Sequence, residues 1–354
     1  MPALSVLDHV LIRPDQTSGD AIAATTALAQ RADAVGYRRY WIGEHHNVAS
    51  LVSTNPSVLL GLVAAATERI RVGPGGIQLP NYGALAVAEN FALLEAALPG
   101  RVDLGVGRAP GGDGVTTFLL RGGRSDEGGD RYPEQVEQLA AMMTGSGLDL
   151  EIGNAGQTSA YNLKATPGAM SVPEVWLLGS GTYSAEPAAR QGRPFVFAHH
   201  FAGHGTERAL AAYRSAFRPS RQLAEPKAFI VVNAVVADTA EEADFLALSQ
   251  LHILARFETG QPFGRQFLAE EAAELPITDA LRPVIDALRE TFVIGDATTA
   301  AKQVTALADR FDVDEIMIHP VPSARRGGPT RRSPGRERTL ELLARELLAR
   351  ELLG

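Results

Sequence analysis

Short apolar runs of β-type residues alternate with alanine-rich helical stretches along most of this 354-residue chain. The alternation is typical of a parallel sheet wrapped by helices, because neighbouring parallel strands are usually joined by a helical crossover. The runs that qualify as strands are residues 6–12, 40–43, 70–79, 102–106, 175–178, 195–199, 228–236 and 315–318. The clearest helical stretches between them are residues 19–35, 56–67, 85–98 and 298–310.

Eight strands suit a closed barrel, whereas a doubly wound sheet usually has fewer. No G-x-G-x-x-G motif follows the first strand, as a dinucleotide-binding sheet would require. Two long segments interrupt the alternation, at about residues 109–173 and 239–289. We therefore predict an α/β fold, a (β/α)8 TIM barrel with insertions after strands 4 and 7. Such insertions often form lids, and the glycine-rich stretch 122–129 is the candidate.

The last part of the chain departs from this pattern. A segment rich in Gly and Pro contains Arg325, Arg326, Arg331, Arg332, Arg336 and Arg338, and ELLARELLARELLG follows it. A five-residue repeat advances a helix by about 500°, so its leucine pairs spiral around the axis. We interpret residues 1–320 as a single barrel domain and residues 321–354 as a solvated basic loop with a C-terminal helical extension. A partner contact is the alternative.

Composition limits the classes of function. The net charge of -8 argues against binding of nucleic acid or of an anionic membrane surface. The absence of cysteine excludes disulfides, thiolate metal sites and a cysteine nucleophile. The chain starts without a signal-peptide pattern, and no apolar run approaches the roughly 18 residues of a membrane span. We expect a cytoplasmic protein that acts on a small molecule.

The run WIGEHHN places Glu44, His45 and His46 directly after the second predicted strand, at the barrel end where active sites lie. Because side chains alternate along a strand, His45 and His46 cannot both point inward. Histidine can exchange a proton near neutral pH. We assign Glu44 and His45 as catalytic candidates, with a structural role as the alternative.

Glycine-rich motifs follow the third, fourth and fifth strands. The GPGGIQLP run at 73–80 indicates either a kink or a close approach of backbone to a ligand. Arg108 after strand four and GSGTYS at 179–184 supply a guanidinium and free N–H groups at a helix start, which suit a phosphate. The motifs predict a phosphorylated cofactor. The candidate residues are Gly75, Gly76, Ile77, Arg108, Ser180, Gly181 and Tyr183.

Three more residues near strand ends are candidates for substrate binding, namely Asp8, Gln78 and His199. His199 and His200 could also simply line a pocket. The first strand and its neighbours lack the H-x-H pair typical of metal-dependent barrel hydrolases, so we assign no metal ligand. A hydrolase that binds metal through Glu44, His45 and either His199 or His200 remains an alternative.

Several of these motifs, in this order, resemble the luciferase-like monooxygenase family, especially its single-chain bacterial branch. They are SVLDHV at 5–10, YRRYWIGEHHN at 37–47, RIRVGPGGIQLPN at 69–81, LEAALPGRVDLGVGRAPGGD at 94–113, VWLLGSGTYSAEPAARQGRPFVFAHHF at 175–201 and DVDEIMIHP at 312–320. The chain departs from the family at 81–84, which reads NYGA where members often carry a proline. The adjacent pocket wall can therefore differ.

The resemblance implies roles for the candidates. His45 would lie beside a flavin ring and support its oxygen chemistry. A non-prolyl cis peptide bond would join Gly75 to Gly76 against the ring. Arg108 would bind the flavin phosphate, and the turn that contains Ser180, Gly181 and Tyr183 would bind it largely through backbone groups.

The activity implied by the resemblance is a flavin-dependent monooxygenation. Reduced FMN from a separate flavin reductase would react with O2 to a C4a-peroxyflavin that oxygenates a small organic substrate, while the protein excludes water. The resemblance also implies a homodimer that associates through the helices after the early strands. Two alternatives on the same fold are an F420-dependent hydride-transfer enzyme and a non-catalytic flavin-binding homologue.

Overall fold

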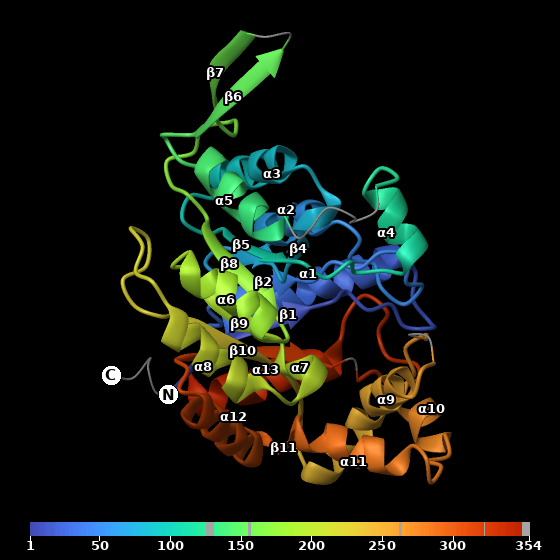
Figure 1. The fold of residues 1–354 in the computed structure, drawn as a ribbon. Helices are drawn as coiled ribbons and strands as arrows, with labels where there is room; N and C mark the ends of the chain where they lie inside the picture. Colours follow the sequence, from blue (N-terminus) through green and yellow to red (C-terminus); the bar gives the residue numbers. More distant parts are fainter. Residues whose placement is uncertain (125–130, 155–156, 262–263, 322, 349–354) are drawn as a thin grey trace.

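The computed structural model describes residues 1–124, 131–154, 157–261, 264–321 and 323–348. Its centre is a barrel of parallel strands with the order β3-β2-β1-β12-β10-β9-β8-β5-β4 (Figure 1). The strands are β1 (Ala3–Asp8), β2 (Arg39–Ile42), β3 (Arg71–Pro74), β4 (Ile77–Gln78), β5 (Asp103–Gly107), β8 (Glu174–Gly179), β9 (Phe195–Phe197), β10 (Ala228–Ala237) and β12 (Glu315–Pro320). β3 and β4 are halves of one interrupted strand, so the predicted (β/α)8 barrel is confirmed.

The interrupted strand closes the barrel. β3 pairs with β2, β4 pairs with β5, and a cis peptide bond joins Gly75 to Gly76 between the two halves. A Cβ atom on Gly105 of β5 would lie 2.2 Å from the carbonyl oxygen of Pro74 in β3. A glycine is therefore required where β5 passes this strand, because any side chain would collide with backbone.

An outer ring of helices covers the barrel. It consists of α1 (Ser18–Ala34), α2 (Pro56–Ala65), α3 (Ala84–Ala97), α5 (Tyr132–Met142), α6 (Thr182–Arg190), α8 (Thr206–Ala216), α12 (Ala297–Phe311) and α13 (Pro334–Leu347). Local sequence fixes where several of them begin. Thr17 and Asp20 form a capping box at α1, and the side chains of Asn55 and Asp296 cap α2 and α12. Within the described residues, no helix is long and apolar enough to cross a membrane.

The two insertions follow the fourth and seventh strands as predicted. The first contains α4 (Gly114–Leu120) and an antiparallel hairpin of β6 (Leu148–Asn154) and β7 (Gln157–Leu163), which projects from the barrel (Figure 1). The second contains α9 (Ala240–Glu258), α10 (Ala269–Glu274), α11 (Arg282–Glu290) and the unforeseen strand β11 (Val293–Asp296), which pairs with β10. Most of the candidate lid at 122–129 lies outside the described residues.

The C-terminal helix α13 is part of the barrel's outer ring. It packs against α1, α12 and β10, and buries Leu340, Leu343 and Leu347. Arg336 on the same helix is only 5% exposed and pairs with Asp8 of β1. The prediction of a solvated basic segment is therefore wrong for Arg336, because a carboxylate distant in sequence draws it into the interior.

Side chains fill the barrel interior from the amino ends of the strands to near their carboxyl ends. At the amino ends of the strands, Arg39 forms ion pairs with Asp103 (2.9 Å) and Glu315 (2.7 Å). Above this charged layer lie Leu7, Trp41, Trp176, Val196, Phe229, Val231 and Met317, which form a buried apolar cluster. Within the described barrel, the space for a ligand therefore lies above this cluster, at the carboxyl ends of the strands.

Candidate active site

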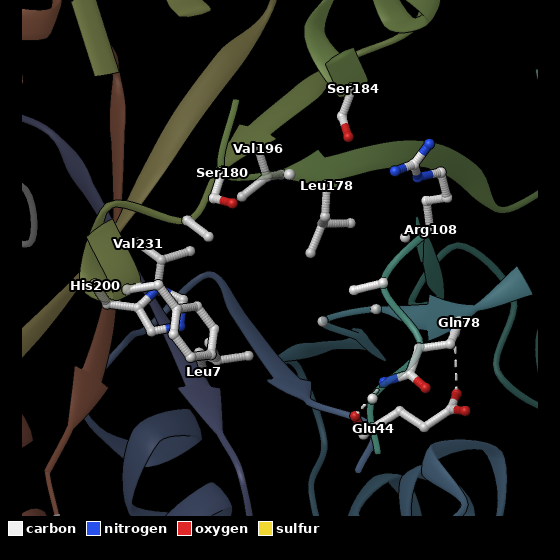
Figure 2. A pocket seen from close by; sticks show the side chains of 18 of the residues that line it. Leu7, Glu44, Gln78, Arg108, Leu178, Ser180, Ser184, Val196, His200 and Val231 are labelled. Atoms are coloured by element: carbon white, nitrogen blue, oxygen red, sulfur yellow. Dashed lines mark hydrogen bonds between the residues drawn. The ribbon is translucent and has the colours of Figure 1, made fainter. Parts of the chain in front are cut away.

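A cavity of about 530 Å³ lies at the carboxyl ends of the barrel strands. The side chains of Leu7, Leu178, Val196, Val231 and Met317 give it an apolar lining. Figure 2 shows Arg108 and Ser184 together on one side of the cavity and His200 on the opposite side. An apolar middle with polar groups at separate ends suits an elongated ligand that has a charged end.

Glu44 organises the wall next to the interrupted strand. Its carboxylate accepts hydrogen bonds from the Tyr82 hydroxyl (2.9 Å) and the Gln78 backbone N–H (3.1 Å), and lies 2.8 Å from Nε2 of His46. The Gln78 amide in turn donates to the backbone oxygen of Glu44 at 2.6 Å, as Figure 2 shows. The Glu44 carboxylate is thus satisfied within the protein, and it positions β4 and Gln78 at the cavity.

His45 lines the cavity, while His46 turns toward Glu44, in agreement with the alternation expected from the sequence. The backbone N–H of His45 donates to the Ser53 oxygen at 3.0 Å, which holds the residue in place. Burial, followed by the nearby His46, lowers the pKa of His45 to about 4. At neutral pH the His45 side chain is therefore an uncharged imidazole that can donate one hydrogen bond and accept another.

Arg108 and the start of α6 form the cationic end of the cavity. The Arg108 guanidinium lies 3.9 Å from the centre of the Tyr183 ring. Gly181 caps α6, and a Cβ atom on Gly181 or on Gly107 would meet nothing within 4 Å, so the backbone faces open space. A guanidinium beside the exposed N–H groups of a helix start can hold a phosphate.

Gly75 and Gly76 also line the cavity. A Cβ atom on Gly75 would lie 2.5 Å from Cδ1 of Leu7, and one on Gly76 would lie 2.8 Å from the Gly105 oxygen. Because the two glycines have no side chains, the strand packs closely against the barrel interior and its backbone faces the cavity. Bare backbone offers a surface against which a flat ring system can lie.

Three predicted site residues turn away from the cavity. Ile77 is buried in the main hydrophobic core, and Nδ1 of His199 pairs with the Thr206 hydroxyl at 2.7 Å. Asp8 is buried and bound to Tyr40, Thr25 and Arg336. None of the three is among the described residues that line the cavity. Strand alternation and the start of the short helix α7 (His199–Ala202) point these side chains elsewhere, so the predicted roles of Ile77 in cofactor binding and of Asp8 and His199 in substrate binding gain no support from the cavity lining.

Comparison with known proteins identifies the family. The family model described as luciferase-like monooxygenase matches residues 4–313. The chain belongs to the luciferase-like monooxygenase family. A luciferase-like monooxygenase of Escherichia coli K12 is 40% identical to it over 325 residues, which cover 90% of this chain and 91% of the relative.

Solved structures agree with this assignment. The crystal structure of apo-MsnO8 matches with a TM-score of 0.84 and 29% identity over 98% of both chains. The oxygenating constituent of 3,6-diketocamphane monooxygenase from Pseudomonas putida, solved in complex with FMN, matches with a TM-score of 0.69 over 98% of both chains. At 18% identity, this second likeness shows the fold alone.

This luciferase-like monooxygenase family member also gathers histidines that sequence reasoning did not assign to the site as a group. The His9 ring centre lies 4.9 Å from that of His45, 4.8 Å from that of His319 and 5.9 Å from that of His200. Each of the four lies at or just after the carboxyl end of a barrel strand. That position is the signal that could have revealed the cluster, because such ends converge in a parallel barrel.

The histidine cluster does not form a metal site of recognisable geometry. Across the described parts of the chain, no group of three or more His, Cys, Asp or Glu side chains is arranged so that it could hold a metal ion. Glu44, which the hydrolase alternative requires as a ligand, is already bound to Tyr82 and Gln78. The arrangement favours hydrogen bonding to an organic ligand.

Proposed function

We propose that this protein is a flavin-dependent monooxygenase that uses reduced FMN and O2 to oxygenate a small organic substrate. One observation carries the proposal: the cationic end at Arg108 and the bare backbone of Gly75–Gly76 line the same cavity, around an apolar middle. FMN has a dianionic phosphate at one end and a flat ring system at the other. The donor set and the shape of the lining therefore fit it.

The residues divide the binding task between them. Arg108 and the backbone of the turn at Ser180 and Gly181 would hold the phosphate, and the Tyr183 ring packs against the Arg108 guanidinium. Gly75 and Gly76 would face the ring. Glu44 keeps β4 in place through the Gln78 backbone N–H, so its role is positioning. A bound flavin supplies the redox chemistry that activates O2.

The chain's own contribution to the chemistry comes from His45 and the apolar lining. A neutral His45 can donate a hydrogen bond to an oxygen atom that gains negative charge, without placing a permanent cation in the site. Leu178, Val196 and Val231 exclude water from the centre of the cavity. Exclusion of water favours oxygen transfer to substrate over release of hydrogen peroxide.

F420-dependent hydride transfer is the second candidate, because the same phosphate-binding end would accept the phosphate of a deazaflavin. Anaerobic titration with reduced FMN and with reduced F420, followed by admission of O2, separates the two. We expect micromolar or tighter binding of FMN and incorporation of 18O from labelled O2 into product. Preferential binding of F420 without oxygen consumption would favour hydride transfer, and binding of neither would refute both.

A matched pair of variants tests the phosphate end. Arg108→Ala should weaken FMN binding by about 10- to 100-fold, because a charge-assisted phosphate contact is lost, and should leave riboflavin binding unchanged. Arg124→Ala removes an arginine of the same loop region that lies outside the described cavity lining, and should leave both unchanged. Equal losses for FMN and riboflavin in Arg108→Ala would place the phosphate elsewhere.

We further propose that the protein receives reduced flavin from a separate reductase and acts as a homodimer through α2 and α3. These helices contact each other and expose Val58 (62%), Leu62 (50%) and Leu93 (59%). Neighbouring exposed apolar side chains are typical of an interface. The double variant Val58→Lys/Leu62→Lys should sediment as a monomer, whereas an unchanged mass would exclude this interface.

A further inference from the structure

We infer that His9 and His200 form a subsite that binds a hydroxyl group of the organic substrate, at the end of the cavity away from Arg108. The inference rests on the proposed function only in naming the ligand as a substrate. Both residues line the cavity, and His200 lies across it from Arg108 (Figure 2). Their rings are 5.9 Å apart and inclined by 30°.

The ring nitrogens of this pair lack hydrogen-bond partners. Nδ1 and Nε2 of His9 and of His200 are all buried, and none has a partner in the described structure. The two side chains are only 8% and 7% exposed. Buried polar groups are nearly always paired in native proteins. A ligand group that pairs with these nitrogens at the cavity surface would satisfy them.

His319 lies beside both rings, with its ring centre 4.8 Å from that of His9 and 5.8 Å from that of His200. The nitrogen of His319 that carries the proton can be assigned from its hydrogen bond. The Asn233 amide nitrogen donates to the His200 backbone oxygen at 2.9 Å, so its Oδ1 faces Nδ1 of His319 at 2.7 Å. Nδ1 of His319 must therefore carry the proton, which leaves a lone pair on Nε2. Nε2 has no partner within the described residues. A buried lone pair next to the two rings is therefore also left without a donor in the part of the chain that the structure describes.

The backbone around His9 is shaped to present its ring. Val10 has a φ of 49°, a left-handed conformation that is rare and costly for a β-branched residue. The Asp8 carboxylate stabilises it by accepting the Val10 backbone N–H at 2.8 Å. A Cβ atom on Gly43 would lie 2.3 Å from Nδ1 of His9, so the ring fills space that only a glycine leaves open. Strain maintained beside a cavity is typical of functional sites.

The chemistry of the pair favours a hydroxyl group over other oxygen groups. Burial and then the neighbouring imidazoles lower the pKa of both His9 and His200 well below the usual value, so both are neutral at pH 7. Each neutral ring offers one N–H donor and one lone pair. A hydroxyl both donates and accepts, an ether or ketone only accepts, and a carboxylate would be buried without a counter-charge.

The first test compares probes that differ only in this group. Cyclohexanol, methoxycyclohexane and cyclohexanecarboxylate are titrated into 15N-histidine-labelled protein, with oxidised FMN and again without flavin. We expect cyclohexanol to bind about tenfold more tightly than the ether, since the ether leaves a buried acceptor unpaired. It should also shift the 15N resonances of His9 and His200. Equal affinities, tighter binding of the carboxylate, or shifts confined to other histidines would overturn the proposal.

The second test uses substitutions. His9→Leu and His200→Leu should each abolish the preference for cyclohexanol, while His200→Asn, whose amide donates and accepts, should retain part of it. His204→Asn is the matched control, because His204 is exposed and outside the described lining. A preference that survives both leucine variants would refute the subsite. The titration without flavin keeps this result separate from the proposed function, which fails instead if FMN does not bind.

Discussion

Arg336 of α13 donates a hydrogen bond to the carboxylate of Asp8 at the end of β1, with 2.7 Å between Nη2 and Oδ1 and both side chains buried. Nε of Arg336 also donates to the Pro320 oxygen at the end of β12, at 2.8 Å. Asp8 in turn holds the Val10 backbone beside the cavity. One guanidinium therefore ties the C-terminal helix to two barrel strands directly behind the site.

Removal of this guanidinium should destabilise the protein strongly. Arg336→Leu leaves the Asp8 carboxylate buried without a counter-charge, and loss of one partner of a buried pair typically costs about 3–5 kcal/mol. Urea unfolding at pH 7 measures the change. Arg331→Leu serves as the control, since the Arg331 side chain is 69% exposed and its 3.5 Å contact with Asp20 should contribute little to stability.

The double variant Asp8→Asn/Arg336→Leu should recover part of the loss, because it removes the unpaired charge. A double variant less stable than Arg336→Leu would show that Asp8 serves mainly through its bonds to Tyr40 and Thr25.

Stability should fall as the pH drops from about 6.5 toward 4. Burial is the main cause that lowers the pKa of His45 to about 4 and of His319 to about 3, and it also lowers the pKa of His9 and His200. In this window the unfolded chain binds protons that the folded protein does not, so the unfolding free energy decreases with decreasing pH.

The variant His9→Leu should reduce the pH dependence of the unfolding free energy by the equivalent of about one bound proton, because it removes one histidine whose pKa is lowered in the folded protein. Unfolding free energies measured by urea between pH 4.5 and 7.5 give the slope, with His204→Asn as the control. A slope that His9→Leu leaves unchanged would mean that His9 titrates normally in the folded protein.

Glu44→Gln should weaken FMN binding about tenfold. The substitution keeps the size of the side chain but replaces the carboxylate that accepts from the Tyr82 hydroxyl and the Gln78 backbone. Fluorescence titration with FMN measures the affinity. Tyr82→Phe removes only one of these hydrogen bonds and should have a smaller effect. An effect of Tyr82→Phe as large as that of Glu44→Gln would locate the critical contact at the Tyr82 hydroxyl.

Gly105→Ala should lower stability by about 1–3 kcal/mol, the usual cost of overpacking a tight interior. The added Cβ would lie 2.2 Å from the Pro74 oxygen, and backbone cannot rotate away as a side chain can. Gly107→Ala is a close control two residues along the same strand, because its Cβ would meet nothing within 4 Å. The midpoint of thermal unfolding should therefore be lower for Gly105→Ala than for Gly107→Ala. Equal midpoints would contradict the close approach of β5 to the Pro74 oxygen.

The sequence predicted the features of the site that depend on local pattern. The alternation at His45 and His46, the glycines at 75 and 76 and the arginine after the fourth strand all lie in short motifs. Their positions at the barrel mouth follow from where each motif stands relative to a strand. The structure places His45, Gly75, Gly76 and Arg108 in the cavity lining, while the roles assigned to them stay predictions.

Features that depend on partners distant in sequence could not be predicted. Arg336 reads as one more cation in a basic segment, and only folding brings it to Asp8. His9 and His319 occur near opposite ends of the chain, and their ring centres are 4.8 Å apart only because β1 pairs with β12. The strand β11 was missed because four residues after a helical insertion carry little periodic signal.

The pairing of β1 with β12 also has a consequence for biosynthesis. A ribosome makes β1 well before β12 and α13, which emerge only after the other described elements. Until then the edge of β1 that pairs with β12 is exposed, and the Asp8 carboxylate lacks its partner Arg336. We expect nascent chains of this protein to depend on chaperones until late in translation, because long-range strand pairing is slow and leaves edges exposed.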